Sequence, residues 1–291
     1  MFIDIHAHAY RRSAPWPVRF ATPEEVLARY DSLGIGRGVL LPIVSPEVYL
    51  PQTNEEILEM VEWFPDRFIP FCNVDPRALT NSADAPLGDL LRHYRDRGCK
   101  GLGEVMPNLE VEDDLVQNLF RHAQEVGFPV IFDGTDRRRG DFGLYDDPGL
   151  PQLQRTLQRF PDLVILGHGP VFWAEIGPVE IKPAPGKRVM RWSSAPLLEE
   201  GAVPRMMRQF PNLYGDLSDA NPWHVLSGDP DYGARFLTEF QDRLLFGTDI
   251  CFAEMPLPIV DLLQAWRRDG RISATVFQKV ARENAVRLLG L

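Results

Sequence analysis

Two histidines stand two residues apart near the start of the chain, in a run whose residue types favour a β-strand. The chain has six histidines, and this pair is His6 and His8. Because side chains alternate between the two faces of a strand, both imidazoles point to the same side and can reach one cation. Neutral imidazole nitrogens suit zinc, manganese or iron. The pair therefore predicts a metal site, although two histidines close together by chance are the alternative for this motif taken alone.

A histidine or a carboxylate also stands at the end of five other apolar runs. These residues are Glu104, Asp133, His168, Asp216 and Asp249. Each one alone has a structural explanation, because a polar residue at a strand end often caps a helix or bonds to the backbone. If the runs are strands of one parallel barrel, however, their carboxyl ends meet on one face. Together with the histidine pair, these residues form a set of potential ligands for a metal centre.

Short apolar runs rich in β-branched residues alternate along the chain with stretches of helical spacing. The predicted strands span residues 2–5, 38–43, 67–73, 99–105, 128–132, 163–166, 213–216 and 244–247. The predicted helices span residues 23–33, 54–64, 86–97, 112–126, 150–160, 196–210, 230–240 and 274–289. This order predicts an α/β protein, a (β/α)8 TIM barrel that forms a single domain over residues 1–291.

The alternative fold is a doubly wound open sheet, which normally carries a glycine-rich phosphate loop after its first strand. Here the first strand ends in His-Ala-His, which favours the barrel. Closure of a barrel makes the first and eighth strands neighbours. We therefore expect His6, His8 and Asp249 to converge, although they lie at opposite ends of the sequence.

The longest interval between predicted strands follows strand six. It predicts an inserted loop region at residues 171–203, which forms a lid, a pocket wall or a dimer contact. Trp173 in this region, Arg137 after strand five, and Trp223 with His224 after strand seven are candidate substrate-binding residues. For Arg137 the alternative is an ordinary solvated loop.

The composition excludes several classes of protein. Against 31 basic residues the chain has 41 acidic ones, a net charge of -10, so neither a nucleic acid nor an anionic membrane is an expected partner. Three cysteines without CxxC spacing indicate no disulfide framework and fit a reducing cytoplasm. The start of the chain does not resemble a signal peptide, and no apolar run is long enough to span a membrane. We expect a cytoplasmic protein that acts on a small molecule, as a monomer or a homo-oligomer.

Four motifs in this order resemble those of the metal-dependent amidohydrolase superfamily: IDIHAH at 3–8, LVILGHG at 163–169, LLFGTD at 244–249 and VARENAVRLL at 280–289. Within it, the chain resembles the amidohydrolase-related (amidohydrolase 2) group. That group includes small-molecule hydrolases and decarboxylases of the carboxymuconate-semialdehyde and resorcylate type. The resemblance spans the whole chain and implies an amidohydrolase-type barrel, but it does not fix a substrate.

The resemblance also implies roles for single residues. His6 and His8 would be metal ligands, Asp249 a ligand and proton acceptor, and His168 a ligand or a catalytic histidine close to the metal-bound water. One position departs from the family pattern, because members of this group usually carry a histidine at the end of strand five, where this chain has Asp133. Asp133 is then either a ligand or a hydrogen-bond acceptor that orients His168 or the start of the next helix.

Glu104 is similar to the strand-four glutamate of the TatD-like and phosphotriesterase-like branches of the superfamily. In those branches the glutamate binds one metal ion or bridges two, whereas the decarboxylases do not require it. Glu104 in this chain either faces the metal or supports another ligand. In the first case it favours a hydrolytic site.

Three functional hypotheses follow. The leading one is a hydrolase in which a divalent ion activates water to attack a carbonyl, such as an amide, lactone or ester, or a related electrophile. Zinc is the first candidate and manganese the alternative, with one ion or two. The second hypothesis keeps the site but assigns a metal-dependent, non-oxidative decarboxylase of an aromatic or unsaturated acid. The third is a metal-binding barrel without catalytic activity.

Overall fold

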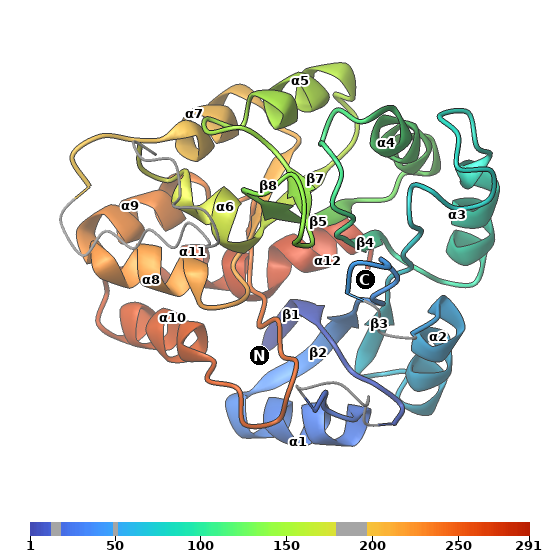
Figure 1. Ribbon diagram of the computed structural model, residues 1–291. Coiled ribbons are helices and arrows are strands. Elements are labelled where there is room, and N and C mark those ends of the chain that lie inside the picture. The colour runs from blue at the N-terminus through green and yellow to red at the C-terminus, as the bar shows by residue number, and fades with distance from the viewer. Residues whose placement is uncertain (13–18, 49–51, 179–196) are drawn as a thin grey trace.

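The computed structural model describes residues 1–12, 19–48, 52–178 and 197–291 of the 291-residue chain. Parallel strands stand at the centre of the molecule and helices surround them (Figure 1). The barrel strands are β1 (Phe2–Ala7), β2 (Ile35–Leu40), β3 (Phe68–Pro70), β4 (Leu102–Val105), β5 (Val130–Thr135), β7 (Ile165–His168), β8 (Leu213–Asp216) and β9 (Leu244–Leu245). A further short strand, β6 (Leu144–Tyr145), pairs with β5 and was not predicted.

Backbone hydrogen bonds close the strands into a barrel. Within the two sheets the orders are β1-β2-β3 and β4-β5-β7-β8-β9. One junction is bridged by Cys72 N, which donates to Gly101 O at 3.0 Å, and the other by Ile5 N, which donates to Phe246 O at 2.9 Å. The (β/α)8 barrel predicted from the sequence is therefore confirmed.

Most of the predicted helices form, with small shifts at their ends. The outer helices are α1 (Pro23–Leu33), α2 (Asn54–Trp63), α3 (Leu87–Asp96), α4 (Asp114–Val126), α5 (Pro151–Arg159), α7 (Ala202–Gln209) and α9 (Pro230–Glu239). The predicted C-terminal helix is α11 (Ala274–Gln278), a π-helical turn (Lys279–Glu283) and α12 (Asn284–Leu289). Among the described helices, none has the length and apolar character that a membrane span requires.

Three helices were not predicted: α6 (Gly169–Ala174), α8 (Asn221–Gly228) and α10 (Pro258–Arg268). Each has a proline among its first residues, where the fixed backbone angle of proline suits a helix start. The predicted loop at 171–203 was wrong at its start, because α6 extends into it, whereas at its end the predicted helix 196–210 forms as α7. Residues 179–196 of that loop, and with them the predicted helix start at 196, lie outside the described residues.

Side-chain caps and a left-handed residue define the ends of the first two outer helices. Thr22 and Glu25 form a capping box at the start of α1, and Gly34 ends this helix in the left-handed conformation at φ 74°. At α2 the N-cap is Thr53 and not Asn54. The side chain of Asn54 instead bonds to the backbone of Asn73.

The barrel interior is filled with apolar side chains below the polar strand ends. This inner cluster includes Ile3, Ile5, Val39, Leu41, Ile69, Phe71, Ile131, Leu166 and Leu245. Ala285 and Leu289 of α12 join it. Because the interior is packed, a site for a ligand can form only at the strand ends, where the polar residues lie.

A buried carboxylate fixes the junction between β1 and the segment after β9. Asp4 is fully buried and accepts hydrogen bonds from His6 N at 3.0 Å, from Thr248 N at 2.9 Å and Oγ1 at 2.5 Å, and from Tyr30 Oη at 2.6 Å. Burial raises the pKa of Asp4 to about 6, although these donors counteract it. Asp4 thus connects β1, α1 and the loop that carries Asp249.

We expect Asp4→Ala to lower the free energy of unfolding by about 2–3 kcal/mol, because it leaves buried donors without an acceptor. Denaturation by urea measures this change. The control is Asp31→Ala, since Asp31 is 66% exposed and its pair with Arg67 should contribute less than about 1 kcal/mol. An equal loss in both variants would contradict the role assigned to Asp4.

Candidate metal centre

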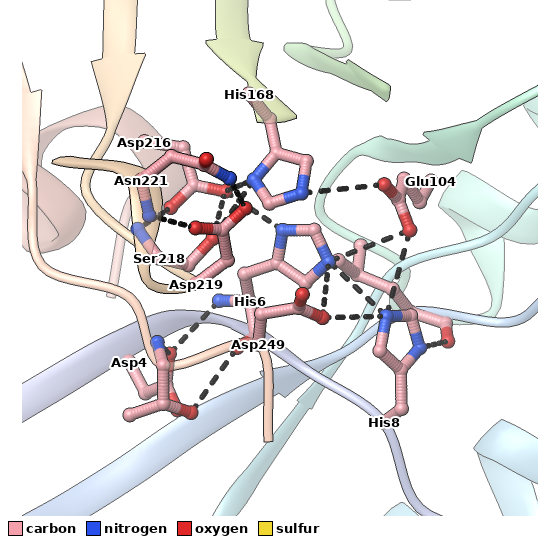
Figure 2. Close-up of polar contacts among 12 residues, drawn as sticks. Asp4, His6, His8, Glu104, His168, Asp216, Ser218, Asp219, Asn221 and Asp249 are labelled. Atoms are coloured by element: carbon pink, nitrogen blue, oxygen red, sulfur yellow. Dashed lines mark hydrogen bonds and ion pairs between the residues drawn. The ribbon is translucent and has the colours of Figure 1, made fainter. Parts of the chain in front are cut away.

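The two N-terminal histidines point at the same place, as their spacing predicted. Both side chains are buried, and their Nε2 atoms lie 3.1 Å apart. The Nδ1 atom of His8 lies 3.0 Å from the carbonyl oxygen of Leu41, which fixes the orientation of this ring. The Nε2 atoms of both rings are therefore directed toward one point above the barrel (Figure 2).

Two carboxylates complete this group of donor atoms. Glu104 Oε2 lies 3.5 Å from Nε2 of both histidines. Asp249 Oδ1 lies 3.5 Å from His6 Nε2 and 3.3 Å from His8 Nε2. Zinc bonds nitrogen and oxygen at about 2.0–2.1 Å, and a tetrahedron of that size has edges of about 3.3–3.4 Å. The nitrogen–nitrogen and nitrogen–oxygen separations are close to these edges, and His6, His8 and Asp249 offer donor atoms that all lie within 4.8 Å of one another. This group can therefore hold a divalent cation such as zinc, with Glu104 beside it.

A second group of potential ligands adjoins the first. Glu104, Asp133 and His168 each offer a donor atom, and these atoms lie within 4.8 Å of one another. His168 Nε2 lies 3.5 Å from Glu104 Oε1, so each oxygen of Glu104 faces a different group. Asp133 pairs in register with His168 on neighbouring strands. The structure therefore brings Asp133 to the place that the departure from the family pattern indicated, beside His168.

Asp216 connects the two groups, because it contacts one histidine of each group at the ring nitrogen that does not face the site. Its Oδ2 lies 2.7 Å from His6 Nδ1 and 3.2 Å from His168 Nδ1, and it accepts a hydrogen bond from Ser218 Oγ at 2.9 Å. A carboxylate on the far nitrogen of a ligating histidine fixes its tautomer and makes it a better donor. The sequence placed Asp216 at a strand end, but it gave no sign that the residue would hold two histidines together.

The carboxylates make this region favourable for positive charge. Burial by itself lowers the pKa of His6, but the charges of Glu104, Asp249 and Asp216 outweigh it and raise the pKa of His6 well above its ordinary value. Burial likewise opposes ionisation of Glu104, yet His6 and His168 hold the pKa of this carboxyl well below its usual range. The arrangement therefore favours positive charge at this point, from protonated histidines or from a metal cation.

The backbone of Asp249 has an uncommon conformation. Its φ is 54°, in the left-handed region that residues with a side chain seldom adopt, and its N donates to His6 O at 2.8 Å. The Asp249 side chain is 22% exposed, whereas those of His6, His8 and Glu104 are at most 5% exposed. The strained residue thus presents its carboxylate both to the histidines and to the open side of the site.

A cavity of about 350 Å³ opens above these residues. Its lining residues are His8, Phe20, Ile43, Val48, Glu104, Met106, Asp133, Phe142, His168, Pro170, Asp219, Asp249, Cys251, Phe252 and Met255. Asp219 was missed from the sequence, although it lies three residues after the strand-end Asp216. Its side chain accepts hydrogen bonds from the backbone and side chain of Asn221, and burial raises its pKa to about 6.

The four candidate substrate-binding residues do not line this cavity in the part of the chain that the structure describes. Trp173 is fully buried, and its Nε1 donates to the carbonyl oxygen of Asp216 at 3.0 Å, so it packs behind the site. Trp223 and His224 lie on α8 with their ring centroids 4.7 Å apart. Arg137 is half-buried, and its N donates to Thr135 Oγ1.

A closed parallel barrel with histidines and carboxylates at the carboxyl ends of its strands defines the class of (β/α)8 enzymes with a candidate metal centre. The model of the amidohydrolase family (amidohydrolase 2) matches residues 3–291, and the chain belongs to this family. The search of curated protein sequences found no match.

Several solved structures share the fold over the whole chain. An amidohydrolase from Burkholderia multivorans with bound zinc is 16% identical, with 100% of this chain and 99% of that chain covered and a TM-score of 0.65. A probable 2-pyrone-4,6-dicarboxylic acid hydrolase from Acinetobacter baumannii is 14% identical, with 100% of this chain and 99% of that chain covered and a TM-score of 0.62. A 2,6-dihydroxybenzoate decarboxylase from Rhizobium is 15% identical, with 99% of this chain and 98% of that chain covered and a TM-score of 0.58. At these identities the likeness shows the fold alone.

Asp216→Asn should lower the affinity for zinc about 10–100-fold, because both histidine Nδ1 atoms lose an ionised partner. Competition with a chromogenic chelator measures the affinity. The control is Ser218→Ala, which removes one hydroxyl beside Asp216 and His168 and should have a smaller effect. A folded Asp216→Asn variant that binds zinc as tightly as the wild type would refute this role.

Zinc binding should release protons at neutral pH. Burial and the charge of His6 oppose protonation of His168, but Asp216 and Glu104 outweigh them and raise the pKa of His168 to about 10. Because the metal-free site then carries protons at pH 7, zinc must displace them, and its affinity should rise with pH between about 6 and 9. Calorimetry in buffers of different ionisation enthalpy counts the protons. A pH-independent affinity with no proton release would contradict this expectation.

Proposed function

We propose that the protein is a metal-dependent hydrolase of a small-molecule carbonyl compound, such as an ester, lactone or amide. The observation that carries the proposal is that His6 Nε2 and His8 Nε2 converge at 3.1 Å, while Glu104 Oε2 and Asp249 Oδ1 each lie 3.3–3.5 Å from both nitrogens. His8, Glu104 and Asp249 also line the cavity. This set would hold one divalent cation, and Glu104, Asp133 and His168 would hold a second if one binds.

When bound, a divalent cation supplies Lewis acidity, which polarises a carbonyl group and makes water more acidic. The residues of the chain supply the rest of the chemistry. Asp249 Oδ2 is not one of the four converging atoms, and in this proposal it takes the proton of the attacking water and passes it to the leaving group. His168 is oriented through Nδ1 by Asp216 and Ser218. When one cation is bound and the His168 ring is protonated, its Nε2, which faces Glu104 Oε1 at 3.5 Å, would donate to the developing oxyanion.

Zinc is the cation that we propose first. A set of imidazole nitrogens and carboxylate oxygens suits zinc, and the Burkholderia multivorans amidohydrolase of the same fold binds it. Asp133 in place of a histidine would add an oxygen ligand and negative charge to the second group. That substitution shifts the preference of the second position toward harder cations such as manganese.

A decarboxylase is the second candidate, because the Rhizobium protein of the same fold is a 2,6-dihydroxybenzoate decarboxylase. In that reaction the proton would be delivered to carbon, and carbon dioxide would leave without consumption of water. Measurement of carbon dioxide release from a carboxylic acid, against release of acid from an ester, separates the two reactions.

Asp249→Asn should reduce kcat for hydrolysis by a factor of about 10³ or more, since an amide cannot accept the proton of the water. Turnover of phenyl acetate by the zinc-loaded enzyme measures this loss, and removal of zinc with a chelator should abolish the same activity. Asp269→Asn is the matched control, because Asp269 is an exposed aspartate at the end of α10 and does not line the cavity.

The fold of Asp249→Asn is checked by its far-ultraviolet circular dichroism and melting temperature. A folded, metal-loaded variant with full activity would refute the role of Asp249. A loss of activity no larger than that of Asp269→Asn would refute the role of Asp249 as well.

A further inference from the structure

Asp219 lines the cavity, although it takes no part in the proposed hydrolysis. One of its carboxylate oxygens, one nitrogen of His168 and one oxygen of Asp249 lie within 4.8 Å of one another. Asp219 is half-buried, so a ligand in the cavity can reach its side chain. A group that contacts Asp219 therefore lies beside the carbonyl group on which Asp249 and His168 would act.

Two neighbouring segments hold the Asp219 carboxylate in place. Asn221, the first residue of α8, donates to it twice, from its backbone N to Oδ1 and from its side-chain Nδ2 to Oδ2 (Figure 2). The backbone N of Asp219 donates to Thr248 O at 3.3 Å, next to Asp249. Because Asp219 is bound both to the start of α8 and to the segment after β9, its position relative to Asp249 is fixed.

These contacts leave part of the acceptor capacity of the carboxylate unused. An ionised carboxylate offers about four lone-pair sites on its two oxygens. Asn221 occupies one site on each oxygen, so each oxygen can accept a further hydrogen bond from a ligand.

The bond from the backbone of Asn221 also has a local explanation. Aspartate often accepts from the amide two residues further along the chain, which forms a turn. A turn has no preference among the ligands of a cavity, whereas an acceptor beside the reacting carbonyl has one. The two roles therefore predict different results for variants of Asp219.

We infer that Asp219 is a specificity-determining residue, which accepts a hydrogen bond from an N–H or O–H group next to the reacting carbonyl of the ligand. This inference rests on the proposed function for the reacting carbonyl group. A site built to accept such a bond discriminates against an analogue without the donor, because the acceptor then loses water without gaining a partner. The charge of the carboxylate strengthens the bond.

Benzamide and acetophenone test the inference, since they differ only in the NH₂ or methyl group beside the same carbonyl. The ring of either ligand can lie against apolar side chains of the cavity, such as Ile43 and Met106. Binding to the zinc-loaded protein is measured by titration with saturation-transfer NMR, and the same spectra show whether benzamide is hydrolysed. We expect benzamide to bind at least about tenfold more tightly than acetophenone.

Asp219→Ala removes the acceptor and should reduce the preference for benzamide to less than about twofold. Asp219→Asn keeps the turn and a neutral acceptor, so it should retain an intermediate preference.

The matched control is Asn81→Ala. Asn81 also has a left-handed backbone, with a φ of 50° against 65° for Asp219, but it is exposed and does not line the cavity. Alanine should therefore cost a similar amount of backbone strain at both positions, and Asn81→Ala should keep the full preference for benzamide. Melting temperatures verify that all three variants fold.

The affinity for zinc separates this role from that of a metal ligand, since Asp219 could instead join His168 and Asp249 around a cation. If Asp219 accepts from the ligand, Asp219→Ala should bind zinc with nearly the affinity of the wild type in competition with a chromogenic chelator. A fall of more than about tenfold, as expected for loss of a group that holds the metal, overturns the inference.

The remaining results separate this inference from the proposed function. Equal binding of the two ligands to the wild type, an unchanged preference in Asp219→Ala, or no binding of either ligand at millimolar concentration overturns the inference. A preference that Asp219→Ala abolishes and Asn81→Ala retains supports it. That pattern together with no hydrolysis of phenyl acetate supports the role of Asp219 in ligand recognition and overturns the proposed reaction.

Discussion

The closure of the barrel between its first and last strands is the constraint on which the candidate site depends. Asp249 N donates to His6 O at 2.8 Å, and Asp4 accepts from His6 N and Thr248 N in the same region. These bonds join segments from the two ends of the sequence. Because each bond is buried and directional, they fix where the Asp249 carboxylate meets the two histidines, and no contact that is local in sequence could do so.

Buried charge at one end of the barrel determines how the acidic and histidine side chains of the candidate site pair. Glu104, Asp216 and Asp249 all face His6 and favour positive charge there, because they raise the pKa of this histidine well above its ordinary value against the effect of burial. Protonated histidines supply that charge in the metal-free protein, and a divalent cation would supply it in the loaded one.

Much of the fold could be predicted because its signals are local. The alternation of apolar runs with helical stretches predicted all eight barrel strands, and capping residues such as Thr22 and Gly34 mark the ends of α1. The errors have physical reasons as well. The helices α6, α8 and α10 occupy connections that the pattern of one helix after each strand does not require.

The sequence by itself determined the types of donor group and the strand ends that carry them, because side-chain alternation and barrel geometry follow from local patterns. It could not decide how each side chain would be used. Trp173 points behind the site to Asp216 O, and Asp216 itself bonds to two histidines from distant strands. Such partners are chosen by packing across the barrel, and the left-handed backbone that aims Asp249 is held by contacts remote in sequence. Only the tertiary structure brings those groups within bonding distance.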